Sequence, residues 1–450
     1  MAINFDLLFA LLFYGLILFW FFKQRGRFEV QGRIIALYKT KIGLEWMEKI
    51  SKKDDHAWVI IFGIILLIGG VVFGIFGILL DYQLMLTLGS FSFLFGLLLA
   101  IPLNWWGYVG IVVGFLGMGF IFYFLVKGTL QLLLVPDAMP AVAPVLPGIR
   151  VPGLPVLSFW HWILGIFFVA VVHEFAHGIW ARLYKMKVKS SGFLFLGPIL
   201  GAFVEPDEKE LAKKPKRHQL AVFAAGPFSN VVFGLIFLLL INFVTGPFYH
   251  SLYQGVGIEV NKVVDDYPAA QANLQPPFIV KEINGKATTN LALFVNATKD
   301  IVPGTKVHLV TNKGAYDLVA AANPDNATKG FMGIADFSFK TEPKEAVIAK
   351  YGAWFPPFYT WIHMLIFWLV VINFGIGLFN LLPLGPIDGG RMFLTAMLAI
   401  CKDNKKKATK IWSFVSFFCL ALIFINLAPY LWKLLLWLLK PFMMLGAFLW

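Results

Sequence analysis

The chain has 450 residues, of which 59% are apolar and only 14% are charged, and its mean hydropathy is +0.76. Soluble domains carry about 45–50% apolar and about 25% charged residues. The composition therefore excludes an ordinary soluble enzyme, a disordered chain and a fibrous repeat protein. It indicates that a lipid bilayer forms part of the solvent.

The net charge of +13 fits a membrane protein whose lysines and arginines lie in cytoplasmic loops. No basic run is interleaved with aromatic residues, so we expect no nucleic-acid partner. The two cysteines, Cys401 and Cys419, are isolated in the sequence. They predict neither a zinc cluster nor a disulfide framework.

Nine apolar runs approach the roughly 20 residues that a membrane-spanning helix needs. They cover residues 5–22, 57–80, 84–101, 105–126, 157–181, 219–245, 357–382, 411–428 and 430–449. Asn104 and Pro429 give the least distinct divisions between neighbouring runs. The first run is too long and too aromatic for a cleaved signal peptide, and no small-residue cleavage site follows it. The sequence therefore predicts a polytopic α-helical membrane protein with about nine spans.

Lysine and arginine residues concentrate in three segments, 23–53, 182–217 and 402–410. Alternation of the spans places these segments on one side, which the positive-inside rule identifies as the cytoplasm, with the N-terminus outside. The segment 127–156 is rich in proline and glycine. We expect it to be an extended outside linker that follows the N-terminal helices of residues 1–126.

One region, residues 250–340, has the composition of a soluble domain. Short runs there alternate apolar and polar residues, and the turn signals Asn284-Gly285 and Pro303-Gly304 separate them. The pattern predicts a small inserted α+β domain, and alternation of the spans places it outside. Two N-glycosylation patterns, at Asn296 and Asn326, fit an exposed location.

The run 157–181 contains His173-Glu174-Phe175-Ala176-His177. Residues four apart on a helix differ by about 40° of rotation and roughly 6 Å of rise, so both imidazoles can reach one metal ion. Glu174 can then reach a water molecule at that ion. The alternative is a chance pattern or a buried histidine pair with an ionic partner. An ionisable group at bilayer depth costs on the order of 2.5–3.5 kcal/mol, which favours a metal site.

Zinc usually takes three protein ligands and keeps one position open for water. Asp388 is the candidate third ligand, because it is the lone carboxylate in a stretch that Pro383, Pro386 and Gly389 interrupt. Irregular backbone at membrane depth is tolerated only where it lines a cavity or is buried in protein. The alternative is a surface loop in which Asp388 caps a helix.

Two further segments are candidates for substrate binding. In Gly226-Pro227-Phe228-Ser229-Asn230, the asparagine could hold a substrate backbone or stabilise an oxyanion, or it could join two helices. Residues 192–205 are apolar, punctuated by glycine and too short per leg to span. They predict a membrane-dipping hairpin whose edge could pair with an extended substrate, or which merely caps the bundle.

These motifs, in this order, resemble the site-2 protease family of intramembrane zinc metalloproteases. The matching pieces are His173 to His177, Gly226 to Asn230, and Asn380 through Asp388-Gly389. The one departure is Ile387, where the family often has leucine. The resemblance covers about residues 157–400. It implies one zinc ion held by His173, His177 and Asp388, with Glu174 as the catalytic residue and Asn230 and Asn380 near the substrate or oxyanion.

The resemblance also implies a division of the chain. The membrane core would comprise residues 157–249 and 341–400, with a PDZ-like domain at 250–340 between them. The helices of 1–126 and 401–450 would have no catalytic role. Gly255-Val256-Gly257-Ile258 resembles a carboxylate-binding loop. Peptide binding and size filtering by this domain are both open.

The expected protein is an integral, multi-pass membrane hydrolase with its active site toward the cytoplasm. It would cut peptide bonds within or near transmembrane segments of membrane-protein substrates, after a first cut by a site-1-type protease. A transporter with an intramembrane ion path is the main rival, but no pair of related halves is found. A catalytically dead membrane chaperone is the second, and it has no evident need for Glu174.

Overall fold

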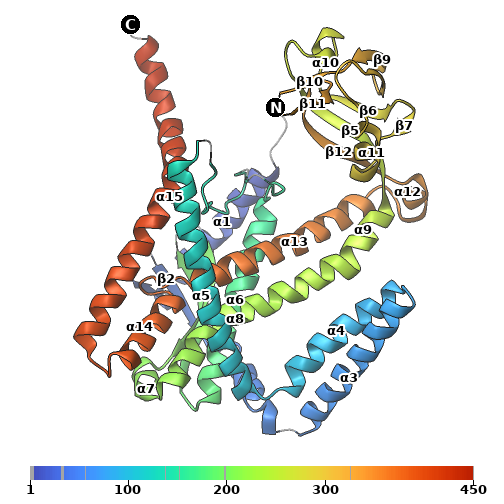
Figure 1. Ribbon diagram of the computed structural model, residues 1–450. Coiled ribbons are helices and arrows are strands. Elements are labelled where there is room, and N and C mark those ends of the chain that lie inside the picture. The colour runs from blue at the N-terminus through green and yellow to red at the C-terminus, as the bar shows by residue number, and fades with distance from the viewer. Residues whose placement is uncertain are drawn as a thin grey trace. The chain divides into compact units, whose positions relative to one another are not determined.

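Seven helices among the described residues are long and apolar enough to cross a membrane. They are α3 (Ala57–Leu79), α4 (Gln83–Ala100), α5 (Leu103–Leu134), α6 (Phe159–Leu183), the segment Lys216–Leu252, α13 (Phe355–Asn380) and the segment Lys405–Lys433. Shorter helix α1 (Phe5–Lys23) covers the first apolar run. The chain is a polytopic, mostly helical membrane protein with an inserted β-rich domain (Figure 1).

The computed structural model describes residues 5–31, 35–55, 57–136, 138–149, 151, 153–196, 199–324 and 326–448. The chain divides into two units. Unit 1 comprises Met1–Phe243 and Met364–Trp450, and unit 2 comprises Val244–His363. Lys216–Leu252 consists of α8 (Lys216–Leu240), a π-helical turn (Ile241–Thr245) and α9 (Gly246–Leu252).

Two predicted boundaries differ from the structure. The runs 411–428 and 430–449 were expected to be separate spans, but α15 (Lys405–Phe448) continues through Pro429 as one helix. A proline in a membrane helix removes one backbone hydrogen bond, which neighbouring groups can compensate. Helix α5 extends to Leu134, so the first eight residues of the predicted linker are helical. Its first proline, Pro136, lies just beyond that end.

Helices α3 and α4 form a tightly packed antiparallel pair. Gly63, Gly70 and Gly77 are spaced by seven residues, so they lie on one stripe of α3. A Cβ atom at any of the three would overlap backbone atoms of α4. The absence of side chains on this stripe therefore lets the two backbones approach closely.

A four-stranded antiparallel sheet lies in unit 1. Its strands are β1 (Phe28–Gln31), β2 (Ile35–Thr40), β3 (Val188–Leu196) and β4 (Ile199–Pro206), in that spatial order. The predicted hairpin at 192–205 corresponds to β3 and β4. Strand β2 pairs with β3 in the register Tyr38↔Phe193, and Gly192 permits this pairing because a Cβ there would overlap the Tyr38 carbonyl oxygen. Strand β4 is left at the edge of the sheet and packs against α6.

The main hydrophobic core of unit 1 joins α5, α6, α8 and α14 (Asp388–Ile400). Its buried side chains include Trp106, Trp180, Phe228 and Met392. Short elements complete the unit: η1 (Arg25–Arg27), α2 (Leu44–Ser51), η2 (Lys53–Asp55) and α7 (Glu208–Lys213). Helix α2 packs on α6 through Met47, which is 1% exposed.

Unit 2 contains its own sheet and core. Its strands are β5 (Tyr253–Val263), β6 (Phe278–Ile283), β7 (Lys286–Ala287), β8 (Lys306–Thr311), β9 (Gly314–Val319), β10 (Ala321–Asn323), β11 (Asn326–Phe331) and β12 (Ile334–Pro343). Its helices are α10 (Pro268–Gln271), α11 (Leu291–Thr298) and α12 (Glu345–Tyr351). The main sheet has the order β12-β5-β6-β8-β9, with β7 paired to β6. The buried core includes Ile258, Val260, Phe278 and Leu309.

Candidate metal centre

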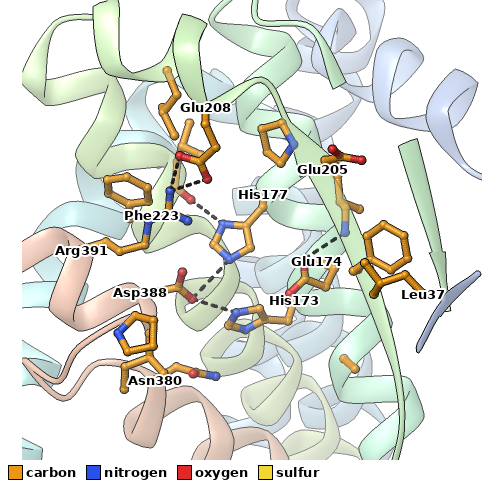
Figure 2. A pocket seen from close by; sticks show the side chains of 18 of the residues that line it. Leu37, His173, Glu174, His177, Glu205, Glu208, Phe223, Asn380, Asp388 and Arg391 are labelled. Atoms are coloured by element: carbon orange, nitrogen blue, oxygen red, sulfur yellow. Dashed lines mark hydrogen bonds and ion pairs between the residues drawn. The ribbon is translucent and has the colours of Figure 1, made fainter. Parts of the chain in front are cut away.

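Helix α6 brings His173 and His177 to one point. Both side chains are buried, with exposed fractions of 7% and 8%. Their Nε2 atoms lie 2.9 and 3.3 Å from the same oxygen, Asp388 Oδ2 (Figure 2). One ligand atom from each residue lies within 4.8 Å of the other two. The three side chains that the sequence assigns to a metal therefore converge from two helices.

The backbone between α13 and α14 sets the position of Asp388. The chain leaves α13 at Asn380 and re-enters a helix at Asp388, the first residue of α14. A Cβ at Gly389 would overlap the Leu381 carbonyl, and one at Gly390 would overlap Leu384. These glycines let the turn fold against the start of α14. Because Asp388 contacts both histidines, the alternative of a surface loop is wrong.

The hydrogen bond at the far side of His177 fits a metal ligand. His177 Nδ1 lies 2.6 Å from the Val222 carbonyl oxygen, and a carbonyl only accepts. Nδ1 therefore donates, so Nε2 of the neutral ring carries a lone pair. That lone pair faces a carboxylate oxygen, and two acceptors in contact need a proton or a metal ion between them. A metal ion fits this donor set, because ligating histidines usually donate their other N–H to an oxygen.

Gly226 on α8 keeps the centre open. A Cβ atom at this position would lie 2.5 Å from His173 Nε2 and still closer to His177 Nε2. Any other residue would fill the space that faces the two ligand atoms. The sequence motif contains this glycine, but periodicity and composition gave it no role. The signal that could have identified it is its place within the apolar run 219–245, directly before Pro227.

The two asparagines expected near the substrate have different positions. Asn380 is half-buried and lines the cavity beside the metal centre (Figure 2). Asn230 is 0% exposed, is not among the cavity-lining residues, and lies with Nδ2 3.0 Å from His173 Nδ1. The expected contact of Asn230 with substrate is therefore absent from this geometry. The alternative, an asparagine that joins two helices, describes the contact between α8 and α6.

Glu174 lies on the cavity side of α6. Its Oε2 accepts a hydrogen bond from the Val204 N–H of strand β4 at 3.1 Å. Figure 2 shows this bond between the helix and the edge strand. The carboxylate is thus held beside the candidate metal centre and is bonded to strand β4, which pairs with β3 as the last strand of the sheet among the described residues.

The cavity has a volume of about 580 Å³, and its wall includes the N-terminal strands. Glu29, Leu37 and Lys39 line it together with residues of α6, β4, α8 and α14. Lys39 Nζ lies 2.7 Å from Glu29 and 3.3 Å from Glu205. The N-terminal segment, whose helices were expected to have no catalytic role, therefore contributes strand residues to the cavity wall. The hydrogen bond from Ser190 and the charge of Lys39 lower the pKa of Glu205.

A second ion pair, between Arg391 and Glu208, lies on the cavity wall. The Arg391 guanidinium is 2.7 Å from Glu208 and sits 4.3 Å above the centre of the Phe223 ring (Figure 2). Arg391 follows Asp388 by three residues, so the two side chains lie on the same face of α14 at its first turn. The pair links α14 to α7, and the sequence did not single out either residue.

The expected carboxylate-binding loop of unit 2 is not a loop. Gly255, Gly257 and Ile258 lie within strand β5 and pair with β12, and Ile258 also pairs with Val280 of β6. A peptide could be added as a strand at Ile258 only if one edge of β5 were unpaired. Strand β12 pairs with one edge of β5 there, and β6 pairs with the other.

Comparison with known proteins agrees with this geometry. The model of the family described as Peptidase family M50 matches residues 161–423, which contain all the residues of the metal centre. A protein of Methanocaldococcus jannaschii, described as uncharacterized, is 32% identical to this chain over 254 residues. The match covers 55% of this chain and 60% of the relative, so the chain spans less than two thirds of the relative's length.

Proposed function

Because the chain belongs to Peptidase family M50, we propose that it is a zinc-dependent intramembrane metallopeptidase. It hydrolyses peptide bonds within or near transmembrane segments of membrane-protein substrates. The observation that carries the proposal is the convergence of His173, His177 and Asp388 beside Glu174 on one cavity.

Two imidazoles and one carboxylate are a typical ligand set of a catalytic zinc site, and the cavity leaves a fourth position open for water. When bound, zinc supplies a Lewis acid and lowers the pKa of water from about 15.7 toward about 7. Glu174 accepts the proton of the attacking water and later delivers it to the leaving amine. Asn380, which lines the same cavity, binds the substrate backbone near the scissile bond.

The scissile segment must be extended, because a helical substrate has its carbonyl groups hydrogen-bonded. The free edge of β4 offers backbone groups for an added strand. Val204 lies on this edge and contacts Glu174, so a peptide paired there would pass next to the catalytic carboxylate.

The distribution of lysine and arginine supports an active site toward the cytoplasm and a β-rich, PDZ-like domain outside. An upstream protease of the site-1 type would trim the substrate first. For the outside domain, size exclusion is favoured over capture of a peptide by β5, because β12 already pairs with that strand.

Glu174→Gln tests the proposal. The variant should keep one zinc ion per chain and lose cleavage of a labelled single-span membrane protein in detergent, because the amide cannot accept the proton. Glu282→Gln, an exposed glutamate in unit 2, is the control and should cleave normally. Cleavage by Glu174→Gln at the wild-type rate would refute the mechanism, and a wild-type protein without bound metal would refute the metallopeptidase itself.

A further inference from the structure

Asn230 is a buried polar side chain that the proposed mechanism does not use. It lies on α8, is 0% exposed and contacts His173 Nδ1 through its amide group. Nδ2 faces His173 Nδ1 at 3.0 Å, and Asn230 Oδ1 has no hydrogen-bond partner within the described part of the chain. A buried acceptor without a partner costs about 1–3 kcal/mol, so its environment needs an explanation.

The protonation of His173 decides what Asn230 must do. With Nδ2 of Asn230 facing the ring, Nδ1 of His173 accepts from the amide and Nε2–H donates to Asp388. A metal at Nε2 needs the lone pair of that nitrogen, so the proton of the neutral ring moves to Nδ1. Nδ1–H and the amide N–H₂ would then be two donors in contact.

A half-turn of the amide removes this conflict. The oxygen and nitrogen of an asparagine amide are interchangeable in shape, and their assignment follows the surrounding hydrogen bonds. With the amide turned, Oδ1 accepts from His173 Nδ1–H at the same 3.0 Å separation. His173 then matches His177, whose Nδ1 donates to the Val222 carbonyl.

We infer that Asn230 is a positioning residue whose Oδ1 accepts the Nδ1 proton of His173 and holds that ring with Nε2 free for the metal. The inference rests on the proposed metal centre. In this role Asn230 contacts the metal-ligating side chain of His173, and it does not contact the substrate. The loss of such an outer partner usually lowers metal affinity by about 10–100-fold.

Two substitutions test whether Asn230 accepts or donates the hydrogen bond to His173. Asn230→Asp retains only acceptors and should keep zinc affinity within about three-fold of wild type, or tighten it. Asn230→Leu has a similar volume and no acceptor, so its zinc affinity should fall by about 10–100-fold. Affinity is measured with zinc alone, by competition against a chromogenic chelator on the full chain in detergent. Thermal unfolding without metal checks the fold of each variant.

Asn373 provides the matched control. It is also 0% exposed on a membrane helix, α13, and its Oδ1 also lacks a partner within the described residues. Its Nδ2 donates to the Leu369 carbonyl of its own helix and not to a proposed metal ligand. Asn373→Leu should leave zinc affinity unchanged.

Each outcome decides the inference. Zinc affinity of Asn230→Leu within three-fold of Asn373→Leu would overturn it, and so would a ten-fold loss in Asn230→Asp, which would show that native Asn230 donates. If one Asn230 variant fails to fold, the other still gives a decision. A wild-type protein that binds no zinc would refute the proposed function, whereas normal wild-type binding with indifferent Asn230 variants would refute this inference alone.

Discussion

Gly226→Ala should remove zinc binding by adding a single methyl group. The new Cβ would lie 2.5 Å from His173 Nε2, whereas ordinary contacts of a Cβ begin near 3.4 Å. The imidazole would have to withdraw by about 0.9 Å. Zinc–nitrogen bonds are about 2.0–2.1 Å and native sites hold them within about 0.2 Å, so this displacement exceeds the tolerance several-fold.

The rings have little room to withdraw. His177 is fixed by its 2.6 Å hydrogen bond to Val222, on the same helix as Gly226. We therefore expect zinc affinity to fall by more than about 100-fold, or about 2.7 kcal/mol. The overpacking itself should lower the free energy of unfolding by roughly 1–3 kcal/mol.

Elemental analysis measures the zinc content of the variant, and competition with a chelator measures its zinc affinity. Gly375→Ala is the control, because a Cβ at this position on α13 would meet nothing within 4 Å. It should bind zinc as wild type does. A Gly226→Ala protein that retains one zinc ion at wild-type affinity would show that the metal does not lie between the two Nε2 atoms, and the geometric reasoning would be refuted.

Three further outcomes are expected. Asp388→Ala should lower zinc affinity by more than about 100-fold, which is more than the loss of a residue that only contacts a ligand would cause. Unchanged metal content would show that Asp388 is not a ligand. A double-mutant cycle on Arg391 and Glu208, read by thermal unfolding, should give a coupling of about 0.2–1 kcal/mol because the pair is largely exposed; a value above about 2 kcal/mol would contradict this. Gly70→Ala should destabilise the α3–α4 pair by roughly 1–3 kcal/mol, while Gly69→Ala, with nothing within 4 Å, should not, and equal unfolding temperatures would contradict the packing argument.

The sequence predicted the three side chains that converge in the candidate metal centre because each is an ionisable side chain in an apolar segment. His173 and His177 need only the helical repeat to share a face. Asp388 needed a further argument, since it is about 210 residues away, but its cost at membrane depth identified it. The apolar runs likewise predicted the helices, because length and hydropathy are local properties.

Other features depend on partners that local patterns do not identify. Strands β1 and β2 lie in a segment whose charges were attributed to a cytoplasmic loop, and their pairing with β3 is visible only in three dimensions. Lys39 is one of those charges, and it lies between Glu29 and Glu205 on the cavity wall. The space beside Gly226 was equally hidden, because the reason for that glycine is the pair of rings on another helix.

The four-stranded sheet has a consequence for biosynthesis. Thr40 of β2 donates a hydrogen bond to the Ser191 carbonyl of β3, and the two residues are 151 positions apart. At about 5–20 residues per second, a ribosome needs roughly 8 to 30 s to extend the chain across that distance. The hairpin of β1 and β2 must therefore remain unpaired on one side while the four membrane helices α3 to α6 are made. The cavity wall would therefore remain incomplete during this interval, although the N-terminal strands that contribute to it are already made.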